Sequence, residues 1–310
     1  MATESVRRVA ERSEEYTRFG VVVGVDGSAE SWNALDWAAR AAVERGTGLR
    51  IVYAVVDPFG AAAEEVRQQV DALLERARER VRDAFPELAV RTAAFEGGAV
   101  STLSILSETA ELLVVGTRGH SALATLLLGS TSVGVSARAF CPVVVLPPGA
   151  DTTRSHGSQV VVGVDGSEVS DEALRFALRE AARMDGSLTV VHGWQLPAPL
   201  DPMALAAAGY TMNFGVFEKR TRDYIDGLVE RARSEVGVDV PIGVRVVYEH
   251  PVQALLDAGR HADLVVVGSH GRGSVAGLFL GSVSQSVLHR SSTPVAVVRH
   301  RWDTEEDWLG

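Results

Sequence analysis

Short, continuous runs of valine and leucine recur along the chain and alternate with longer amphipathic stretches. In the first half the runs predict five strands, over residues 20–25, 49–56, 88–95, 112–115 and 142–146. Apolar residues at helical spacing predict helices over residues 29–45, 62–85, 100–110 and 130–140. Strands without polar alternation are typical of a parallel sheet that is buried on both faces. This alternation predicts an α/β fold: a doubly wound, Rossmann-like five-stranded parallel sheet with strand order 3-2-1-4-5.

The whole pattern then occurs a second time. Residues 160–167 repeat residues 21–28 closely, and Asp165 follows Asp26 by 139 residues. Further on, Gly268 follows Gly116 by 152 residues, so the second copy carries 13 extra residues. We place this insert in residues 195–217, after a strand predicted over 188–194. Three prolines in it favour a tolerated surface insertion over a lid or a partner-binding segment.

The repeat predicts two tandem domains. We expect the first over residues 20–148 and the second over residues 159–300. A charged leader, 1–19, precedes them, a linker rich in Pro, Gly, Asp, Thr and Ser joins them over 149–158, and an acidic tail follows over 301–310. The chain has 310 residues, of which 46% are hydrophobic, and this is enough for two separate cores.

Charge and cysteine content narrow the possible partners and compartments. The formal net charge is −10, which argues against nucleic acid because phosphate backbones need a basic face. Cys141 is the one cysteine, so it cannot form an internal disulfide, and we expect a reducing compartment. The sequence contains no apolar signal-peptide core and no apolar segment of spanning length. We therefore expect a soluble, cytoplasmic protein with no membrane partner.

One spaced glycine pattern carries the candidate chemistry. Gly-x2-Gly-x9-Gly-Ser follows the fourth predicted strand in both halves and leads into a helix. Its members are Gly116, Gly119, Gly129 and Ser130 in the first half and Gly268, Gly271, Gly281 and Ser282 in the second. Glycines allow a ligand to approach the backbone, and the first amides of a helix bind anions. Plain turn chemistry is the alternative, but two copies with the same internal spacing favour an anion site. Ser282 could cap its helix or face the ligand.

An aspartate stands at the end of the first strand in each half. In the predicted strand order the first and fourth strands are neighbours, so Asp26 and Asp165 would face the same crevice as the glycines. A carboxylate there can accept a hydrogen bond from a ribose hydroxyl or an exocyclic amine, while the glycine amides bind phosphates. The combination indicates a nucleotide. On residues alone, an ordinary helix N-cap at Asp-Gly-Ser is an equally good interpretation.

These two motifs together are similar to those of tandem-domain universal stress proteins of the ATP-binding type. The resemblance covers roughly residues 20–146 and 159–299. It implies ATP as cofactor, with Asp26 and Asp165 at the adenosine end and the backbone near Ala54 and Gly193 beside the base. It also implies that the glycines, Ser130 and Ser282 hold ribose and phosphates, and that Ser132 and Ser284 offer further hydroxyls. The regulatory role in the stress response rests on this resemblance.

Enzyme motifs are missing from the glycine loops. The single lysine, Lys219, lies outside them, so a P-loop is excluded, and no Gly-x-Ser-x-Gly elbow occurs. No carboxylate is placed to activate a water, so we expect no catalytic residue and at most slow hydrolysis, with any Mg²⁺ held mainly by phosphates and water. No protein ligand to a metal is predicted. The alternative function is a slow ATPase or nucleotidyl-transferring enzyme on the same fold.

The fifth strands, residues 142–146 and 294–299, are predicted at sheet edges. An apolar edge left open invites aggregation, so we expect edge-to-edge pairing of the two halves. The resemblance implies the same pairing. It further implies association of whole chains, so we expect a homodimer. A protein partner that responds to the bound nucleotide is also expected, but the sequence does not identify it.

Overall fold

The computed structural model describes residues 19–55, 63–117, 129–150, 158–195, 214–271 and 280–299. The chain divides into two units, Met1–Thr152 (unit 1) and Thr153–Gly310 (unit 2). The predicted leader up to residue 18, the predicted tail, most of the predicted linker and Gly119 lie outside the described residues. None of the helices in the described part of the chain has the length and hydropathy that a membrane span requires.

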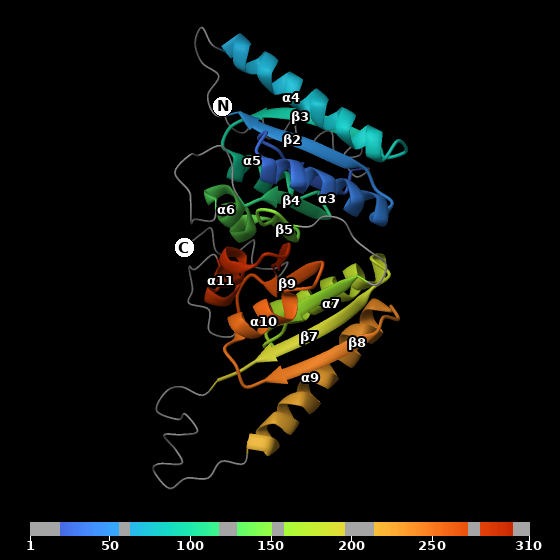
Figure 1. The fold of residues 1–310 in the computed structure, drawn as a ribbon, viewed down its shortest axis with the longest axis vertical. Helices are drawn as coiled ribbons and strands as arrows, with labels where there is room; N and C mark the ends of the chain where they lie inside the picture. The colour runs from blue at the N-terminus through green and yellow to red at the C-terminus, as the bar shows by residue number, and fades with distance from the viewer. Residues whose placement is uncertain are drawn as a thin grey trace. The chain divides into compact units, whose positions relative to one another are not determined.

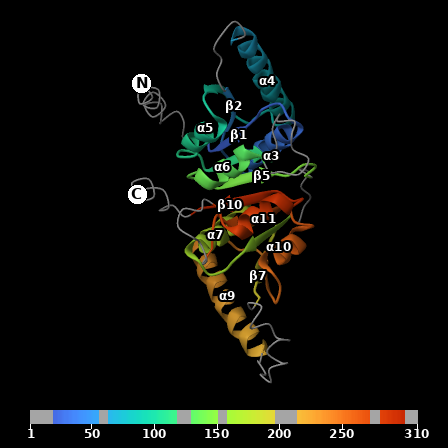
Figure 2. The same ribbon diagram turned by 90° about the vertical axis from the view of Figure 1, so that its left-hand side faces the viewer.

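Unit 1 is a doubly wound parallel sheet. Its strands are β1 (Val21–Gly24), β2 (Leu49–Val55), β3 (Val90–Glu96), β4 (Leu112–Gly116) and β5 (Val143–Leu146), in the order β3-β2-β1-β4-β5. Its helices are α3 (Ala29–Arg45), α4 (Ala63–Ala84), α5 (Ala99–Leu106) and α6 (Ser130–Arg138). Helices α3 and α4 pack together on one face, and α5 and α6 pack together on the other (Figures 1 and 2). The predicted strand order is confirmed.

Unit 2 repeats this architecture. Its strands are β6 (Gln159–Gly163), β7 (Ser187–Gly193), β8 (Ile242–Val247), β9 (Leu264–Gly268) and β10 (Val295–Val298), in the order β8-β7-β6-β9-β10. Its helices are α7 (Glu168–Arg183), α9 (Phe214–Val236), α10 (Pro251–Gly259) and α11 (Ser282–Arg290). Here α7 packs on α9 and α10 packs on α11 (Figure 2).

The valine runs form the core of each unit. All of β5 and β10, and every residue of β4 and β9 before the final glycine, is buried. Full burial of one such side chain stabilises the fold by about 1.5–3 kcal/mol. Two-sided burial explains why these strands show no polar alternation in the sequence.

Several predicted boundaries differ from the structure by a few residues. Helix α5 ends at Leu106, four residues earlier than predicted, because Ser107 begins a turn. The Ser107 hydroxyl donates to Ser104 O at 2.5 Å and accepts from Phe140 N at 2.9 Å, which holds the turn against the end of α6. In the predicted insert, residues 214–217 belong to the 23-residue helix α9, while residues 196–213 lie outside the described part of the chain.

Candidate functional site

The Asp-Gly-Ser segment after β6 forms a tight turn around one carboxylate oxygen. Asp165 Oδ1 accepts from Ser167 N at 3.0 Å and from Ser167 Oγ at 2.6 Å. The middle residue, Gly166, has φ +76°, a backbone conformation that glycine adopts with less steric strain than other residues. Ser167 then caps α7, since its side chain accepts from Ser170 N at 3.2 Å. The turn therefore holds Asp165 in a fixed orientation at the end of β6.

Unit 1 contains the same turn. Asp26 Oδ1 accepts from Ser28 N at 3.0 Å and Ser28 Oγ at 2.6 Å, and Ser28 caps α3. The alternative interpretation of the aspartates as N-caps is therefore wrong, because the cap is the serine two residues later in each unit. Each aspartate side chain instead braces the turn that precedes the cap.

The helices that follow the glycine loops begin without side-chain caps. Gly281 is the N-cap of α11 and Gly129 is the N-cap of α6, and neither helix has an acidic residue in its first turn. Ser282 is thus the first helical residue and not the cap. Helices α3 and α7 differ, since each has a serine cap and an acidic first turn. At α6 and α11 the first amides and the positive end of the helix dipole remain for an anion.

Close backbone packing explains two of the loop glycines. A Cβ at Gly129 would lie 2.5 Å from Thr117 O, whose oxygen accepts from Gly129 N at 2.7 Å. A Cβ at Gly271 would collide with Asp165 Oδ2. The glycine loop of unit 2 therefore passes directly over the aspartate, which brings the two predicted motifs together in one place.

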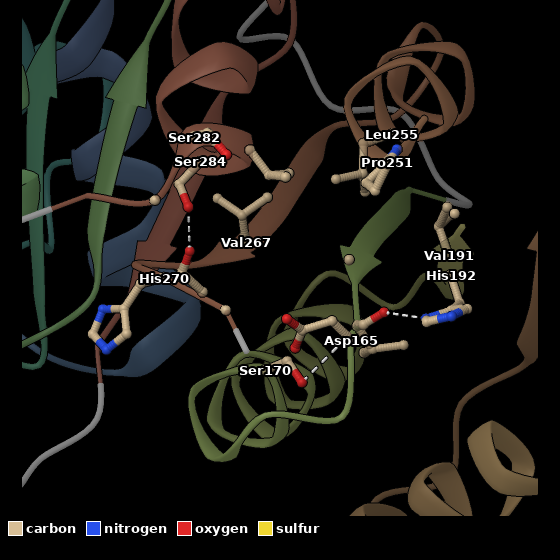
Figure 3. A pocket seen from close by; sticks show the side chains of 17 residues that line it. Asp165, Ser170, Val191, His192, Pro251, Leu255, Val267, His270, Ser282 and Ser284 are labelled. Carbon is tan, nitrogen blue, oxygen red and sulfur yellow. Dashed lines mark hydrogen bonds between the residues drawn. The ribbon is translucent and has the colours of Figure 1, made fainter. Parts of the chain in front are cut away.

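A cavity of about 480 Å³ joins these groups in unit 2 (Figure 3). All seven residues predicted for this half line it: Asp165, Gly193, Gly268, Gly271, Gly281, Ser282 and Ser284. In Figure 3, Asp165 and Ser170 lie below the cavity, Ser282 and Ser284 lie above, and Pro251 and Leu255 lie on the α10 side. The cavity has a polar end at the glycine loop and an apolar end at α10.

Unit 1 has a corresponding cavity of about 330 Å³. Six of the seven residues predicted for this half line it: Asp26, Ala54, Gly116, Gly129, Ser130 and Ser132. The seventh, Gly119, is outside the described residues. Ala99 and Leu103 of α5 form the apolar side, as Pro251 and Leu255 do in unit 2.

The two buried serines one turn into the helices make structural hydrogen bonds. Ser284 Oγ donates to Gly268 O at 2.6 Å, and Ser132 Oγ donates to Gly129 O at 2.8 Å. The Ser284 hydroxyl thus ties the end of β9 to α11, whereas the Ser132 hydroxyl bonds within the first turn of α6. The predicted role at the phosphates requires the hydroxyl to rotate away from that carbonyl.

Some lining residues were not predicted from the sequence. Ser31 and Ser170 line the two cavities, and their hydroxyls accept from the glycine amide of each aspartate turn at 3.1 Å. A serine three residues after Asp-Gly-Ser is the signal that could have found them. The apolar walls from α5 and α10 carry no comparable motif, since their helical pattern does not say which residues face a cavity.

His192 and Cys141 have ordinary structural surroundings. His192 lines the unit 2 cavity, and its Nδ1 lies 2.7 Å from Val164 O, so the ring donates to that carbonyl. Cys141 is buried, and burial raises the pKa of its thiol to about 12, which makes a reactive thiolate unfavourable. Within the described residues, no group of three or more His, Cys, Asp or Glu side chains is arranged to hold a metal.

Comparison with known proteins identifies the family. A model described as the universal stress protein family matches residues 20–147 and 158–299. A universal stress protein of Mycobacterium tuberculosis is 34% identical over 300 residues, which cover 93% of this chain and 99% of the relative.

Solved structures support the same fold. The crystal structure of a universal stress protein from Archaeoglobus fulgidus covers 93% of this chain and 99% of its own, with TM-score 0.68 and 21% identity. A universal stress protein solved in complex with cAMP covers 47% of this chain and 99% of its own at 32% identity. Its TM-score of 0.34 is too low for that complex to bear on the ligand of this chain.

Proposed function

This chain belongs to the universal stress protein family, and we propose that each of its units binds one ATP molecule at the carboxyl end of its sheet. On this proposal the protein is a nucleotide-dependent regulator of the stress response. It acts through its nucleotide-bound shape rather than through a chemical reaction.

One observation carries the proposal. In each unit a single cavity joins a braced aspartate to the start of a helix that has neither a side-chain cap nor an acidic first turn. A carboxylate at one end suits the hydroxyl or amine donors of a nucleoside. Unpaired helix amides at the other end suit a phosphate chain. A ligand that presents donors at one end and anionic oxygens at the other is a nucleotide.

The proposed roles follow the position of each residue around the cavity. Asp26 and Asp165 take the adenosine end, with the backbone near Ala54 and Gly193 beside the base. Ribose and phosphates lie against the residues of the glycine loops and helix starts: Gly116, Gly119, Gly129, Ser130 and Ser132 in unit 1, and Gly268, Gly271, Gly281, Ser282 and Ser284 in unit 2. Any Mg²⁺ is held mainly by the phosphates and water.

The lining favours binding over catalysis. Among the described residues, Asp165 is the only carboxylate that lines the unit 2 cavity, and Asp26 is the only one in unit 1. Each already accepts two hydrogen bonds within its turn. On this proposal each faces the adenosine end of its ligand, so neither lies beside the phosphates to activate a water. A slow ATPase or nucleotidyl-transferring activity is therefore the second candidate, and steady ATP turnover that Gly271→Ala abolishes would favour it.

The assembly is part of the same proposal. We expect a homodimer that forms through sheet edges, a cytoplasmic location, and a protein partner that distinguishes the nucleotide-bound from the nucleotide-free form. Light scattering of purified protein at micromolar concentration tests the dimer, and a monomeric mass would contradict it.

Thermal unfolding with and without millimolar ATP tests the nucleotide sites. At a hundredfold excess over Kd, one occupied site should stabilise its unit by about 2.7 kcal/mol, a shift of roughly 5–10 °C. Asp26→Ala should remove the shift of unit 1, Asp165→Ala that of unit 2, and the double variant should show none. Absorbance at 260 nm first confirms that no nucleotide co-purified.

Exposed aspartates provide a matched control for lost charge. Asp71 of α4 and Asp226 of α9 are both exposed and far along helices that do not line the cavities. Asp71→Ala and Asp226→Ala should therefore keep the full ATP shift. If wild type shows no shift, or if the control variants lose it as well, the proposed sites are wrong.

A further inference from the structure

Unit 2 contains a second cavity, of about 220 Å³, where α10 and α11 end. It is separate from the nucleotide pocket, which adjoins the first turns of the same two helices. Side chains along α10, from the end of α11 and from the segment leading into β10 line it: Gln253, Leu256, Arg260, Arg290, Ser292 and Thr293. At roughly 30 Å³ per liquid water, the space admits one small ion with its hydration shell.

Two guanidinium groups form the walls of this cavity. Arg290 Nη2 donates to Gln253 Oε1 at 3.2 Å, which links α11 to α10, and Arg260 Nη2 donates to Asp257 Oδ1 at 2.6 Å. A guanidinium carries five N–H donors in a planar fork. Among the described residues, each of these two guanidinium groups donates to one side-chain acceptor. Most of their N–H donors therefore remain available to a ligand.

The nearby acceptors are already occupied. Thr293 Oγ1 donates to Gly259 O at 2.6 Å, which satisfies the last carbonyl of α10. Ser291 Oγ donates to Thr293 O at 2.7 Å and accepts from Thr293 N at 3.0 Å, which fixes the segment before β10. One side of the cavity is therefore a segment held by its own hydrogen bonds, and the cavity has more free donors than free acceptors. An excess of donors suits an anion.

The two arginines offset the negative charge around the cavity, so that charge does not oppose an anion. The carboxyl end of each helix contributes a partial charge of about −0.5, so two ends together oppose an anion by about one unit. The two arginines contribute two positive charges, and the carboxylate of Asp257, which Arg260 contacts, contributes one negative charge, so these groups sum to about zero. This contrasts with the formal net charge of −10 for the whole chain.

Unit 1 has no such arrangement at the corresponding positions. Counting back 152 residues, Arg260 corresponds to Glu108 and Ser292 to Phe140, while Arg290 corresponds to Arg138. Phe140 is 42% exposed. An acidic and an aromatic side chain thus stand where unit 2 has an arginine and a serine, so the donor-rich cavity is not a by-product of the shared fold.

We propose that this cavity is a binding site for a small tetrahedral oxyanion of the phosphate class, held between the forks of Arg260 and Arg290. The ligand reaches it from solvent, since both arginines are exposed. This site shares no lining residue with the proposed nucleotide pocket of unit 2, so the two proposals can be tested separately.

Amide chemical shifts of the labelled full-length protein, titrated with inorganic phosphate at constant ionic strength, test this site. Wild type should show saturable shifts at Arg260, Ser291 and Ser292, with a millimolar Kd. In the Arg260→Ala, Arg290→Ala double variant, affinity at these amides should fall at least tenfold. Arg260→Lys with Arg290→Lys keeps the charge but loses the fork, and should bind several-fold more weakly than wild type.

Arg138→Ala removes the corresponding arginine of unit 1 and should leave the shifts at Ser291 and Ser292 unchanged. Because the substituted arginines are exposed, an unchanged melting temperature without phosphate checks that each variant folds. Shifts confined to Gly281 and Ser282 would place phosphate in the nucleotide pocket and overturn the proposal. Equal shifts in wild type and the double variant would overturn it too.

Discussion

The two candidate nucleotide pockets have the same backbone frame and different linings. The hydrogen bonds from the capping serine to the aspartate have the same lengths in both units, and both glycine loops end in an uncapped helix. Yet the cavities measure about 330 Å³ in unit 1 and 480 Å³ in unit 2. Local sequence determines the aspartate turns and the helix starts, whereas the cavity volume depends on which segments pack against the ends of the strands.

The α5 and α10 side of the cavity holds the clearest difference. Unit 2 has Gly193 at the end of β7 and Pro251 at the start of α10, where unit 1 has Ala54 and Ala99. The missing Cβ of Gly193 lets α10 start close to the strand, because a Cβ there would lie 2.9 Å from Pro251 Cα. Proline suits this first helical position, since it has no N–H to satisfy.

The outer helices differ in charge as well. Asp36 of α3 pairs with Arg80 of α4 at 2.7 Å, whereas in α7 the position corresponding to Asp36 is Arg175, which pairs with Glu235 of α9 at 2.6 Å. The polarity of the helix-to-helix ion pair is thus reversed. Both pairs are partly exposed, so neither contributes much to stability. The two units thus differ in surface charge but share the turns around the pocket.

Gly271→Ala should have the largest effect, and only on unit 2. Its Cβ would collide with Asp165 Oδ2, so the carboxylate or the loop must move. Loss of one charge-assisted hydrogen bond costs about 1.5–3 kcal/mol, or roughly 10- to 100-fold in affinity. Calorimetry with ATP in an Asp26→Ala background measures unit 2 alone. Gly243→Ala, which has no heavy atom within 4 Å of its Cβ, is the matched control, and an equal loss there would contradict the account.

Gly193→Ala should destabilise unit 2 more than the reverse change destabilises unit 1. The new Cβ meets backbone, Pro251 Cα at 2.9 Å and Glu249 O at 3.0 Å, and such overpacking costs about 1–3 kcal/mol. Ala54→Gly adds backbone freedom to β2 and costs roughly 0.5–1 kcal/mol. Urea unfolding of both variants makes the comparison. Equal midpoints would mean that the approach of α10 to β7 is not what distinguishes the pockets.

Ser28→Ala and Ser167→Ala should cost the same. Each serine caps its helix through a 3.2 Å bond, so each change should lower the free energy of unfolding by about 1 kcal/mol. Each also removes the 2.6 Å hydroxyl bond to the aspartate, so ATP affinity should fall several-fold in the affected unit. Thermal unfolding with and without ATP gives both quantities. A clear difference between the two serines would show that the frames are not equivalent.

Asp171→Asn should have the smallest effect on stability. The effect is confined to unit 2, because the corresponding residue of unit 1 is Trp32. Asp171 Oδ1 is buried with no hydrogen-bond partner in the described part of the chain. Burial raises the pKa of Asp171 above 3.8, although the positive charges of Arg175 and Arg231 oppose this. The charged form is therefore unfavourable in the folded state at neutral pH, and this penalty disappears as the pH falls towards 3.8.

The Asn variant should accordingly be slightly more stable than wild type at pH 7, and the advantage should vanish in acid. Chemical unfolding at several pH values measures this. If Asp171→Asn is less stable at pH 7, then the charge of Asp171 contributes to the contact between α7 and α9 instead of opposing it.

The strands and the strand order were predictable because continuous valine runs such as those of β4 and β9 are typical of parallel strands that are buried on both faces. The Asp turns and glycine loops were also found, because their chemistry is local. Of the two roles left open for Ser282, the cap belongs instead to Gly281, and only the extended backbone there, with φ −69° and ψ 156°, identifies it. The α10 wall of the cavity depends on packing between distant segments, which a helical pattern does not specify.

Native mass spectrometry of the protein with ATP counts the occupied sites directly. The account predicts two ATP molecules per chain in wild type, one in Asp26→Ala, one in Asp165→Ala and none in the double variant. The surviving site of Asp26→Ala should lose its ATP when Gly271→Ala is added. A wild-type chain that binds no ATP, or one in which a single aspartate substitution empties both sites, would contradict the claim of two separate nucleotide pockets built on the same frame.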